Sequence, residues 1–468
     1  MINTYQCYEF NIKNGVITLY CFLYLIIPLS YAEIIVDENA SLHQQPSVSS
    51  IYIKWSEGHC KELNTHCRGA NYTTINIQSP NDQGVSHNKY VKFDVLKGAG
   101  YDKVSLNNFL ASSTTGNPNL TTQSAKIILN EVTSGNKSIL NGELIVAGEK
   151  AHVIIANPAG ISCDGCYFSN IDHVTLTTGS PIFNKGVLVS YQVNSGIIDI
   201  GSHGLKHDEN SDNYLDLFAH SLVIAGEVRS SDIFTVVGEN IISYAPINGK
   251  VNAKSLTGSS FGDKSNIGLD IYHLGGMYAN KIFIFSRNSG VKNSGVIHAD
   301  NRLMISSNRF IKNNHGRISA GNIILRSLAL IDNKHGVIKN IRLLPVTDTE
   351  EQFGIKITGN ILNNKEGYIH SNIGDVLMRA DGNFYNSGGL IKSMGSQGHA
   401  DIKIKAKLVN NFKGVVVTSN NISINTDSLK NNRGRVVSAF GTVTLRYKTL
   451  EDTTGVLHGG LGVKKTIK

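Results

Sequence analysis

Two close cysteine pairs are the residues of this chain whose types and spacing could do chemistry. They are Cys60 with Cys67, and Cys163 with Cys166. Because an oxidising compartment favours short-range bridges, the spacing predicts two disulfides, Cys60–Cys67 and Cys163–Cys166. Each bridge would close a loop of only a few residues, and such small loops suit the passage of an unfolded chain through a narrow pore.

Redox and zinc chemistry are the alternatives for these cysteines. A redox-active Cys-x-x-Cys needs a lowered thiol pKa, usually at a helix N-terminus, whereas Cys163 follows an Asn-Pro turn in β-rich sequence. A zinc site would use all four thiolates, or one pair with His59 and His66, but the pairs lie far apart and lack the spacing of a zinc finger. The disulfide interpretation is favoured, and no metal site is predicted.

Catalytic carboxylates are sparse in the second half of the chain. Polysaccharide cleavage needs paired carboxylates close together, or a calcium–carboxylate cluster with a basic residue. Between Gly354 and Leu450 the acidic residues fall at one or two per repeat: Glu366, Asp375, Asp381, Asp401 and Asp427. No motif of a serine hydrolase, zinc protease or phosphate loop occurs. We therefore predict no catalytic residue and no cofactor, and keep a β-helical polysaccharide-degrading enzyme as an alternative.

The N-terminus carries the pattern of a secretory signal. An apolar run, Gly15–Leu29, precedes Ser30-Tyr31-Ala32, which places small residues where a cleavage site needs them. The run is too short, and too close to this exit, for a membrane-spanning helix; an uncleaved anchor is the alternative. The sequence predicts a signal peptide over residues 1–32, with cleavage between Ala32 and Glu33.

Positive charge is mild and mostly spread along the chain. The formal net charge is +8, without clustered Lys and Arg interleaved with aromatics, so nucleic-acid binding is not expected. The exception is the segment 401–409, DIKIKAKLV. Period two predicts a single strand there, with Ile402, Ile404, Ala406 and Leu408 inward and Lys403, Lys405 and Lys407 outward. That face could touch an acidic glycan or a lipid headgroup, although a solubilising strand is the favoured interpretation.

A turn-like phrase recurs from Gly295 onward. Its last glycine falls at positions 295, 316, 336, 367, 389, 414, 434 and 455, and the one long interval contains a polar insertion at 345–351. A period near 20 residues, with Asn and Gly at turns and short alternating strands between them, is typical of a parallel β-helix. Each coil of such a fold buries its apolar face on its neighbours, so the inward Val, Ile and Leu form one core.

The repeat also predicts how the turns are built. Glycine is expected to supply positive φ at the corners, and Asn at equivalent turns would form amide ladders from coil to coil. The alternative is a β-sandwich with regularly spaced turns, which the near-constant spacing disfavours.

A family resemblance is carried by Ala156–Pro181, ANPAGISCDGCYFSNIDHVTLTTGSP. This stretch resembles the core of the two-partner-secretion domain that opens filamentous haemagglutinins, ShlA-type haemolysins and contact-dependent inhibition toxins. The resemblance runs from about Ile75 to about Ser294, through QGVSHNKY at 83–90, GNPNL at 116–120, AKIILNEV at 125–132, YLDLFAHSLVIAGE at 214–227 and GGMYANK at 275–281. One departure is Ala159, where the family most often has a second Asn.

The resemblance implies a fold and a domain order. It implies an all-β, right-handed parallel β-helix, a single-stranded solenoid, with an N-terminal cap before the first regular coil. We expect the secretion domain over residues 33–290 and haemagglutinin-type repeats over residues 291–468 that continue the β-helix. Because family members commonly run to thousands of residues, the chain is expected to be a short exoprotein or the product of a truncated gene.

The resemblance also implies a partner and a route. POTRA domains of a dedicated outer-membrane β-barrel transporter would recognise the domain in the periplasm, and the chain would be secreted or reach the surface of a Gram-negative cell. We expect the export domain of an adhesin, a haemolysin or a contact-dependent toxin that meets a host or neighbouring cell. A passive surface rod is the other alternative.

Two secretion motifs are carried over by the resemblance. They are Asn117, Pro118, Asn119 and Leu120 in the first motif, and Asn157, Pro158, Gly160 and Ile161 around Ala159 in the second. The transporter would recognise these residues, or they would be turns that the fold requires, because Pro fixes φ and Asn caps such turns. The sequence leaves both roles open.

Overall fold

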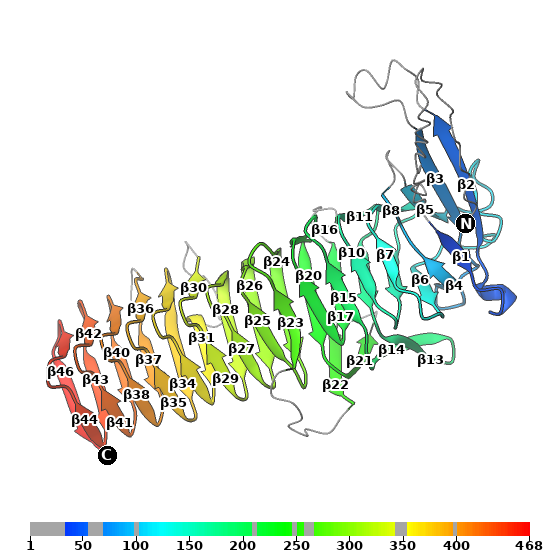
Figure 1. The fold of residues 1–468 in the computed structure, drawn as a ribbon. Coiled ribbons are helices and arrows are strands. Elements are labelled where there is room, and N and C mark those ends of the chain that lie inside the picture. Colours follow the sequence, from blue (N-terminus) through cyan, green and yellow to red (C-terminus); the bar gives the residue numbers. More distant parts are fainter. Residues whose placement is uncertain are drawn as a thin grey trace, which may run out of the picture.

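A computed structural model describes residues 33–54, 69–97, 103–207, 213–245, 250–256, 266–341, 353–395 and 400–468. These residues form an elongated rod of stacked β-strands (Figure 1). The predicted signal peptide, the Ala32 side of its cleavage site, the Cys60–Cys67 pair and the insertion at 345–351 lie outside the described residues. Within them, no helix has the length and apolar character needed to cross a membrane.

Three parallel faces surround one core, and successive coils add a strand or half-strand to each face. We call them the first, second and third faces. From the N-terminal end, the strands of the first face are β4 (Val85–Phe93), β6 (Ile127–Val132), β9 (His152–Ala156), β12 (His173–Thr177), β17 (Tyr214–Ala219), β20 (Asp232–Val237), β24 (Gly276–Ser286), β26 (Val296–Ser307), β28 (Arg317–Ser327), β31 (Phe353–Gly359), β34 (Asp375–Ala380), β37 (Ile402–Lys405), β40 (Ile422–Asn425), β43 (Val443–Tyr447) and β46 (Val463–Ile467).

The second face shares three long strands with the first, because β24, β26 and β28 turn the corner between the two faces. Its other strands are β3 (Gly69–Asn76), β5 (Lys103–Asn108), β8 (Glu143–Gly148), β11 (Cys166–Ser169), β16 (Leu205–His207), β19 (Glu227–Arg229), β30 (Val337–Asn340), β33 (Tyr368–Ser371), β36 (Leu390–Ser393), β39 (Val415–Thr418), β42 (Arg435–Ser438) and β45 (Val456–Gly459).

The third face is a separate sheet of short strands. They are β7 (Ser138–Leu140), β10 (Ile161–Cys163), β15 (Ile197–Ile200), β18 (Ser221–Ile224), β23 (Ile267–Ile271), β25 (Gly290–Asn293), β27 (Phe310–Lys312), β29 (Leu330–Asp332), β32 (Ile361–Asn363), β35 (Asn383–Tyr385), β38 (Leu408–Asn410), β41 (Ser428–Lys430) and β44 (Thr449–Glu451).

Antiparallel strands lie at the N-terminal end and on the outside of the rod. There β1 (Ile34–Val36) pairs with β4, and β2 (Ser47–Lys54) pairs with β3, beside the short 3-10 turn η1 (Leu42–Gln44). Ile34 and Val48 pack against the core and so cap its first coil. A second antiparallel sheet consists of β13 (Ser180–Asn184), β14 (Val187–Val193), β21 (Asn240–Ala245) and β22 (Lys250–Ser255). It covers part of the first face through a separate apolar cluster that includes Tyr191 and Phe218.

The core confirms the repeat found in the sequence. The aliphatic residue that ends each repeated phrase pairs with its equivalent on the next coil, and the run is Ile297, Ile318, Ile338, Ile369, Ile391, Val416, Val436 and Leu457. Ile338 and Ile369 remain paired although the long interval separates them. The insertion therefore leaves the stacking register intact, and the predicted parallel β-helix with an N-terminal cap is confirmed.

The predicted amide ladder is also present. At one corner of each repeat an Asn Nδ2 donates to the Oδ1 of the next coil's Asn, at 2.7–2.8 Å, and the last amide donates to Asp452. The ladder residues, each at most 1% exposed, are Asn293, Asn313, Asn333, Asn364, Asn386, Asn411 and Asn431. Since buried amides need partners, the ladder satisfies polar groups and fixes the register of the coils together.

The recurring glycines that follow the ladder asparagines, here called the ladder glycines, are required for a reason other than the predicted one. Positive φ falls one residue earlier, for example at His315 (61°) and Lys413 (53°), so the prediction that the recurring glycines supply it is wrong. A Cβ on Gly336 would lie 1.9 Å from the backbone oxygen of Asn313, and the equivalent distance at the other ladder glycines after Gly295 is 2.1–2.5 Å. These glycines let the backbone of one coil approach the ladder of the coil before it.

Removing one amide from the middle of the ladder should destabilise the rod. In Asn386→Ala, Asn411 Oδ1 loses its donor and Asn364 Nδ2 loses an acceptor, at a cost of about 1–3 kcal/mol for buried unpaired groups. Urea unfolding of the purified chain would measure this cost. The exposed Asn360, changed to Ala, serves as the control; equal unfolding midpoints for the two variants would contradict a stabilising ladder.

Candidate functional site

Asn157 lies at the corner where the chain passes from β9 to β10. Its side chain is fully buried, and its Nδ2 donates to the backbone oxygen of Asn136 at 2.9 Å and to Ser138 Oγ at 3.0 Å. Its Oδ1 accepts the backbone N–H of Ala159 at 2.9 Å, which closes an Asx turn over Pro158. The amide therefore shapes its own turn and ties that turn to the preceding coil.

Gly160 completes this corner by close approach. Its φ is 118°, and a Cβ there would lie 2.9 Å from the backbone oxygen of Ile197. Its own oxygen accepts the backbone N–H of Ser138 at 3.1 Å, and Ile161 follows in register between Ser138 and Ile198. A side chain at this position would push apart coils that the turn holds together.

Asn117 builds a second corner of the same design, between β5 and β6. Its Nδ2 donates to the backbone oxygens of Ile77 at 2.9 Å and Asn107 at 2.8 Å, while its Oδ1 accepts the backbone N–H of Asn119 at 3.0 Å. Asn117 is fully buried and Leu120 is 1% exposed, whereas Pro118 is exposed.

The two motifs thus share one arrangement. In each, the first Asn faces inward and donates to oxygens of neighbouring segments, while Pro118 is exposed and Pro158 is partly exposed. The two motifs hold different coils, Asn117 beside β3 and β5 and Asn157 beside β7. A protein that met the folded domain would therefore not contact either amide.

The predicted Cys163–Cys166 disulfide is present at the next corner. It joins the end of β10 to the start of β11, and both residues are at most 2% exposed. Asp164 lies in the loop that the disulfide closes. Its Oδ1 accepts the backbone N–H of His203 at 2.8 Å, and its Oδ2 lies 2.9 Å from His203 Nδ1. These hydrogen bonds from His203 lower the pKa of Asp164. Because the two sulfurs bond to each other, neither is free as a thiolate to hold a metal ion.

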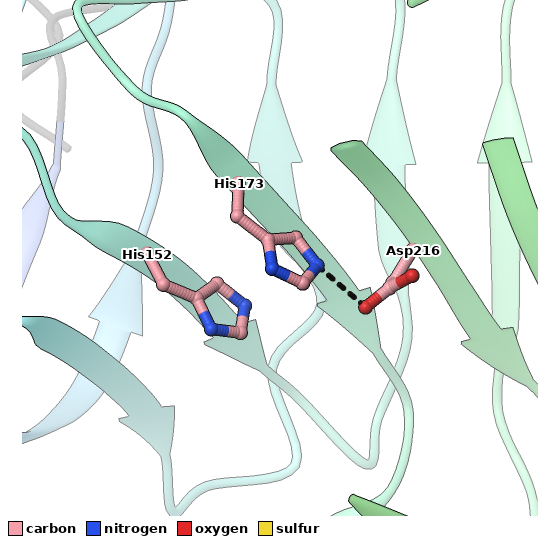
Figure 2. Close-up of side chains that lie close together, drawn as sticks. All are labelled: His152, His173 and Asp216. Carbon is pink, nitrogen blue, oxygen red and sulfur yellow. Dashed lines mark hydrogen bonds and ion pairs between the residues drawn. The ribbon is translucent and has the colours of Figure 1, made fainter. Parts of the chain in front are cut away.

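A cluster of His152, His173 and Asp216 lies on the outer side of the first face, on three successive strands (Figure 2). The two imidazoles stack with centroids 3.8 Å apart and planes 6° apart. His173 Nε2 lies 2.7 Å from Asp216 Oδ2, and His152 Nε2 lies 2.8 Å from the Thr175 hydroxyl, which donates to the same carboxylate oxygen. Burial, and next the charge of His173, lower the pKa of His152 well below its usual value.

The chemistry of this cluster suits a hydrogen-bond network better than a metal. The three ligand atoms lie within 4.8 Å of one another, but each already has a partner within the cluster or at Thr175. Stacked parallel rings also aim their lone pairs side by side, whereas a tetrahedral ion needs ligands that converge on one point. The cluster therefore serves to fasten three coils along the outside of the rod.

The sequence analysis did not predict this cluster, because residues on separate coils come together only once the register of the coils is known. His152 and His173 are 21 residues apart, one coil period, and each opens a strand of the first face. Aligning the strands HVIIA, HVTLT and YLDLFA by that period would have placed both rings in one column.

The chain is similar to known proteins in sequence and in structure. A family model described as the TPS secretion domain matches residues 58–320. Toxin CdiA of Yersinia pestis is 36% identical over 278 residues, covering 57% of this chain and 8% of that protein. The tRNA nuclease CdiA of Escherichia coli O6:K15:H31 is 38% identical over 227 residues, covering 46% of this chain and 7% of that protein. The crystal structure of the filamentous hemagglutinin secretion domain aligns with a TM-score of 0.41 at 20% identity, covering 90% of this chain and 99% of that chain.

The family match defines an export domain and not a catalytic one, because the model describes a secretion domain and covers more than half of the chain. The chain belongs to the TPS secretion domain family, whose members leave Gram-negative bacteria for the cell surface with a partner outer-membrane transporter. It spans less than a tenth of the length of these two curated relatives. The boundary predicted at residue 290 stays a prediction.

His152 should make the domain less stable in mild acid. Its pKa is lowered in the folded state, so below about pH 6.5, its usual value, the unfolded chain binds a proton that the folded chain does not. The contribution of this group to the free energy of unfolding is therefore fully present above that pH. It is lost as the pH drops, by up to about 1.4 kcal/mol per pH unit. Urea midpoints at pH 7 and pH 5 should differ less in His152→Gln than in the wild type. The exposed control, His458→Gln, should keep the wild-type difference; loss of the difference in both variants would exclude His152 as its source.

Loss of the Cys163–Cys166 bridge should have a modest effect. Because the closed loop is very short, Cys163→Ala with Cys166→Ala should cost about 2 kcal/mol or less. The free energy of unfolding would be measured for the double variant and for the wild type under reducing conditions. The two values should agree, because both chains lack the bridge. A double variant that no longer folds would contradict this modest cost, because the bridge would then be essential for the corner between β10 and β11 to form.

Proposed function

We propose that this chain is an exoprotein whose secretion domain is recognised in the periplasm by POTRA domains of a dedicated outer-membrane β-barrel transporter. The chain then crosses that barrel and folds at the cell surface. The family match over residues 58–320 supports this function. The chain would be the export portion of an adhesin, a haemolysin or a contact-dependent toxin, as the CdiA relatives suggest.

The structure supports a specific role for the Asn-Pro motifs within this function. Asn117 and Asn157 are buried when the coils are closed, so the transporter could read them only before folding. Once the chain emerges, the same amides close the first corners of the rod and bind each to a neighbouring segment. We propose that this double use links recognition of the unfolded chain to the start of folding.

The coil architecture offers a source of direction for export. Each coil pairs with the coil before it, so an emerging segment can be held as soon as its neighbour exists, without waiting for distant parts of the chain. Residues 168–468 contain no cysteine, and the one described bridge closes a loop short enough to cross a narrow barrel. Folding outside the cell would thus keep the chain from moving back through the barrel, without energy from nucleotide hydrolysis.

Asn157→Ala tests the proposal. Co-expression with the transporter should show less protein in the medium, with periplasmic entry unchanged, and urea unfolding of the purified domain should show a lower midpoint because Asn136 and Ser138 lose their donor. Asn194→Ala, an exposed change two residues before Gly196, is the control.

The two measurements separate recognition from folding. Secretion that falls far more than stability supports reading of the unfolded motif, and equal losses in secretion and stability leave the turn with a folding role only. Normal secretion of Asn157→Ala would contradict any role of this motif in export. Secretion of the wild type without the transporter would contradict the proposed function itself.

A further inference from the structure

The C-terminal half of the first face presents two adjacent columns of outward side chains. Residues in register on β28, β31, β34, β37, β40, β43 and β46 form each column. The Lys356 column consists of Ile324, Lys356, Leu377, Lys403, Ser423, Thr444 and Lys464. The Arg326 column consists of Arg326, Thr358, Arg379, Lys405, Asn425, Arg446 and Thr466.

Every charged residue in these two columns is basic. Seven of the fourteen positions carry Lys or Arg and none carries Asp or Glu. Adjacent strands lie about 4.8 Å apart, so the cations recur along the rod at one to three times that spacing. Such a row of one sign raises the local concentration of anions.

The lysine segment within these columns differs in part from its prediction. Ile402 and Ile404 face inward and Lys403, Lys405 and Lys407 are exposed, as expected. However, β37 ends at Lys405, and β38 then begins at Leu408 on another face, where the buried residue is Val409. Lys407 therefore lies at a corner, and only Lys403 and Lys405 belong to the columns.

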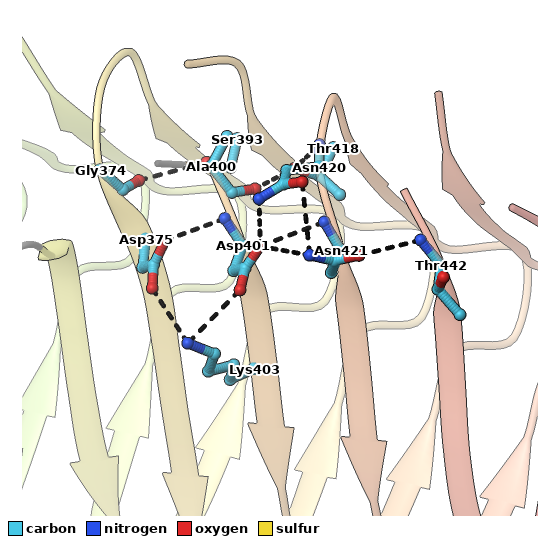
Figure 3. Close-up of polar contacts among 10 residues, drawn as sticks. All are labelled: Gly374, Asp375, Ser393, Ala400, Asp401, Lys403, Thr418, Asn420, Asn421 and Thr442. Carbon is cyan, nitrogen blue, oxygen red and sulfur yellow. Dashed lines mark hydrogen bonds and ion pairs between the residues drawn. The ribbon is translucent and has the colours of Figure 1, made fainter. Parts of the chain in front are cut away.

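Lys403 has a structural partner that sets it apart from the other cations. Its Nζ lies 3.2 Å from Asp375 Oδ2 and 3.4 Å from Asp401 Oδ2 (Figure 3). Both carboxylates belong to a corner network in which Asp375 accepts the backbone N–H of Asp401, and Asp401 accepts that of Asn421. Lys403 thus bridges two stacked carboxylates at the edge of the face and offsets one of their two negative charges.

Four other cations remain available. Arg326, Lys405, Arg446 and Lys464 have exposed side chains, and no ion pair joins them to a carboxylate in the part of the chain that the structure describes. Arg379 pairs with Asp381 at 3.1 Å, but both side chains are more than half exposed, and such surface pairs are weak. These cations can therefore meet an external anion at little cost.

A shallow groove lies over the middle of the columns, on β31, β34, β37 and β40. Its volume is about 310 Å³, and Lys356, Thr358, Arg379, Lys405 and Asn425 are among its lining residues. The hydroxyl and amide groups between the cations can donate to and accept from sugar hydroxyls. The groove thus combines positive charge and neutral hydrogen-bonding groups with apolar surface, to which Leu377 contributes.

The chemistry of the columns favours one kind of ligand. No aromatic side chain occurs in them, so bases of a single-stranded nucleic acid would find no stacking platform. Ile324 is 2% exposed and Leu377 is partly buried, so no apolar side chain projects far enough to enter a bilayer. A polymer of sugars with a carboxylate or sulfate at regular intervals satisfies both the charges and the hydroxyl groups.

We propose that the Arg326 and Lys356 columns bind a linear anionic polysaccharide of a cell surface, laid along the axis of the rod. The site is separate from the Asn-Pro corners and does not depend on the transporter. It would give the exported rod a contact with the glycan layer that it enters.

Binding of the purified mature chain to immobilised heparin and polygalacturonate, with neutral dextran as the blank, tests the proposal. At about 0.15 M salt the wild type should bind both anionic polymers and not dextran. Lys405→Glu with Arg446→Glu should weaken binding by about tenfold or more, a change of about 1.4 kcal/mol. The salt dependence should also become shallower, because fewer counterions are released when fewer cations are engaged.

A matched variant controls for net charge. Lys150→Glu with Lys206→Glu changes the net charge by the same amount at exposed positions on earlier coils and should leave binding near the wild-type value. Lys403 is kept in both variants, and circular dichroism confirms that each remains folded. Equal weakening of both variants, absence of binding at this salt concentration, or stronger binding to phosphatidylglycerol vesicles than to either polysaccharide would overturn the proposal.

Discussion

No coil of this rod can satisfy its own backbone. In a parallel β-helix each strand finds its hydrogen-bond partners on the coils before and after it, so a single coil in water is unstable and every coil is stabilised by stacking. The other features follow from that dependence. The aliphatic columns fill the interior, the amide ladder satisfies the buried corners, and the glycines allow the spacing that stacking demands. A side chain is tolerated according to what it does to the next coil as much as to its own.

The repeat was predictable because its signal lies in the spacing itself. Asn, Gly and an aliphatic residue recur together, and the structure stacks each type on its own kind. The role of the glycine was mistaken because positive φ and close approach both favour glycine, and the sequence does not distinguish them. In the structure the left-handed position falls to residues as different as Glu366 and Arg433, which shows that the corner tolerates strain more readily than bulk.

Other features were not predicted from the sequence, because they depend on contacts between segments that do not follow the repeat. The sheet of β13, β14, β21 and β22 folds back over the first face, and its strands pair antiparallel although the chain separates β14 from β21 by two further coils. The column of His152 and His173 became visible only when the coil register was known. Likewise, the ends of β37 could not be placed from alternation alone, because the chain turns a corner before the alternation ends.

The amide ladder has a direction. Every Nδ2 donates toward the C-terminal end, so the amide dipoles add head to tail as peptide dipoles do in an α-helix. The negative end falls at Asn293, whose buried Oδ1 accepts no hydrogen bond in the described part of the chain, and the positive end meets the carboxylate of Asp452. An ionised carboxylate can accept but not donate, so Asp452 both compensates the accumulated dipole and ends the row. Along this corner the solenoid is electrically polar, and its two ends are distinguishable by charge as well as by chain direction.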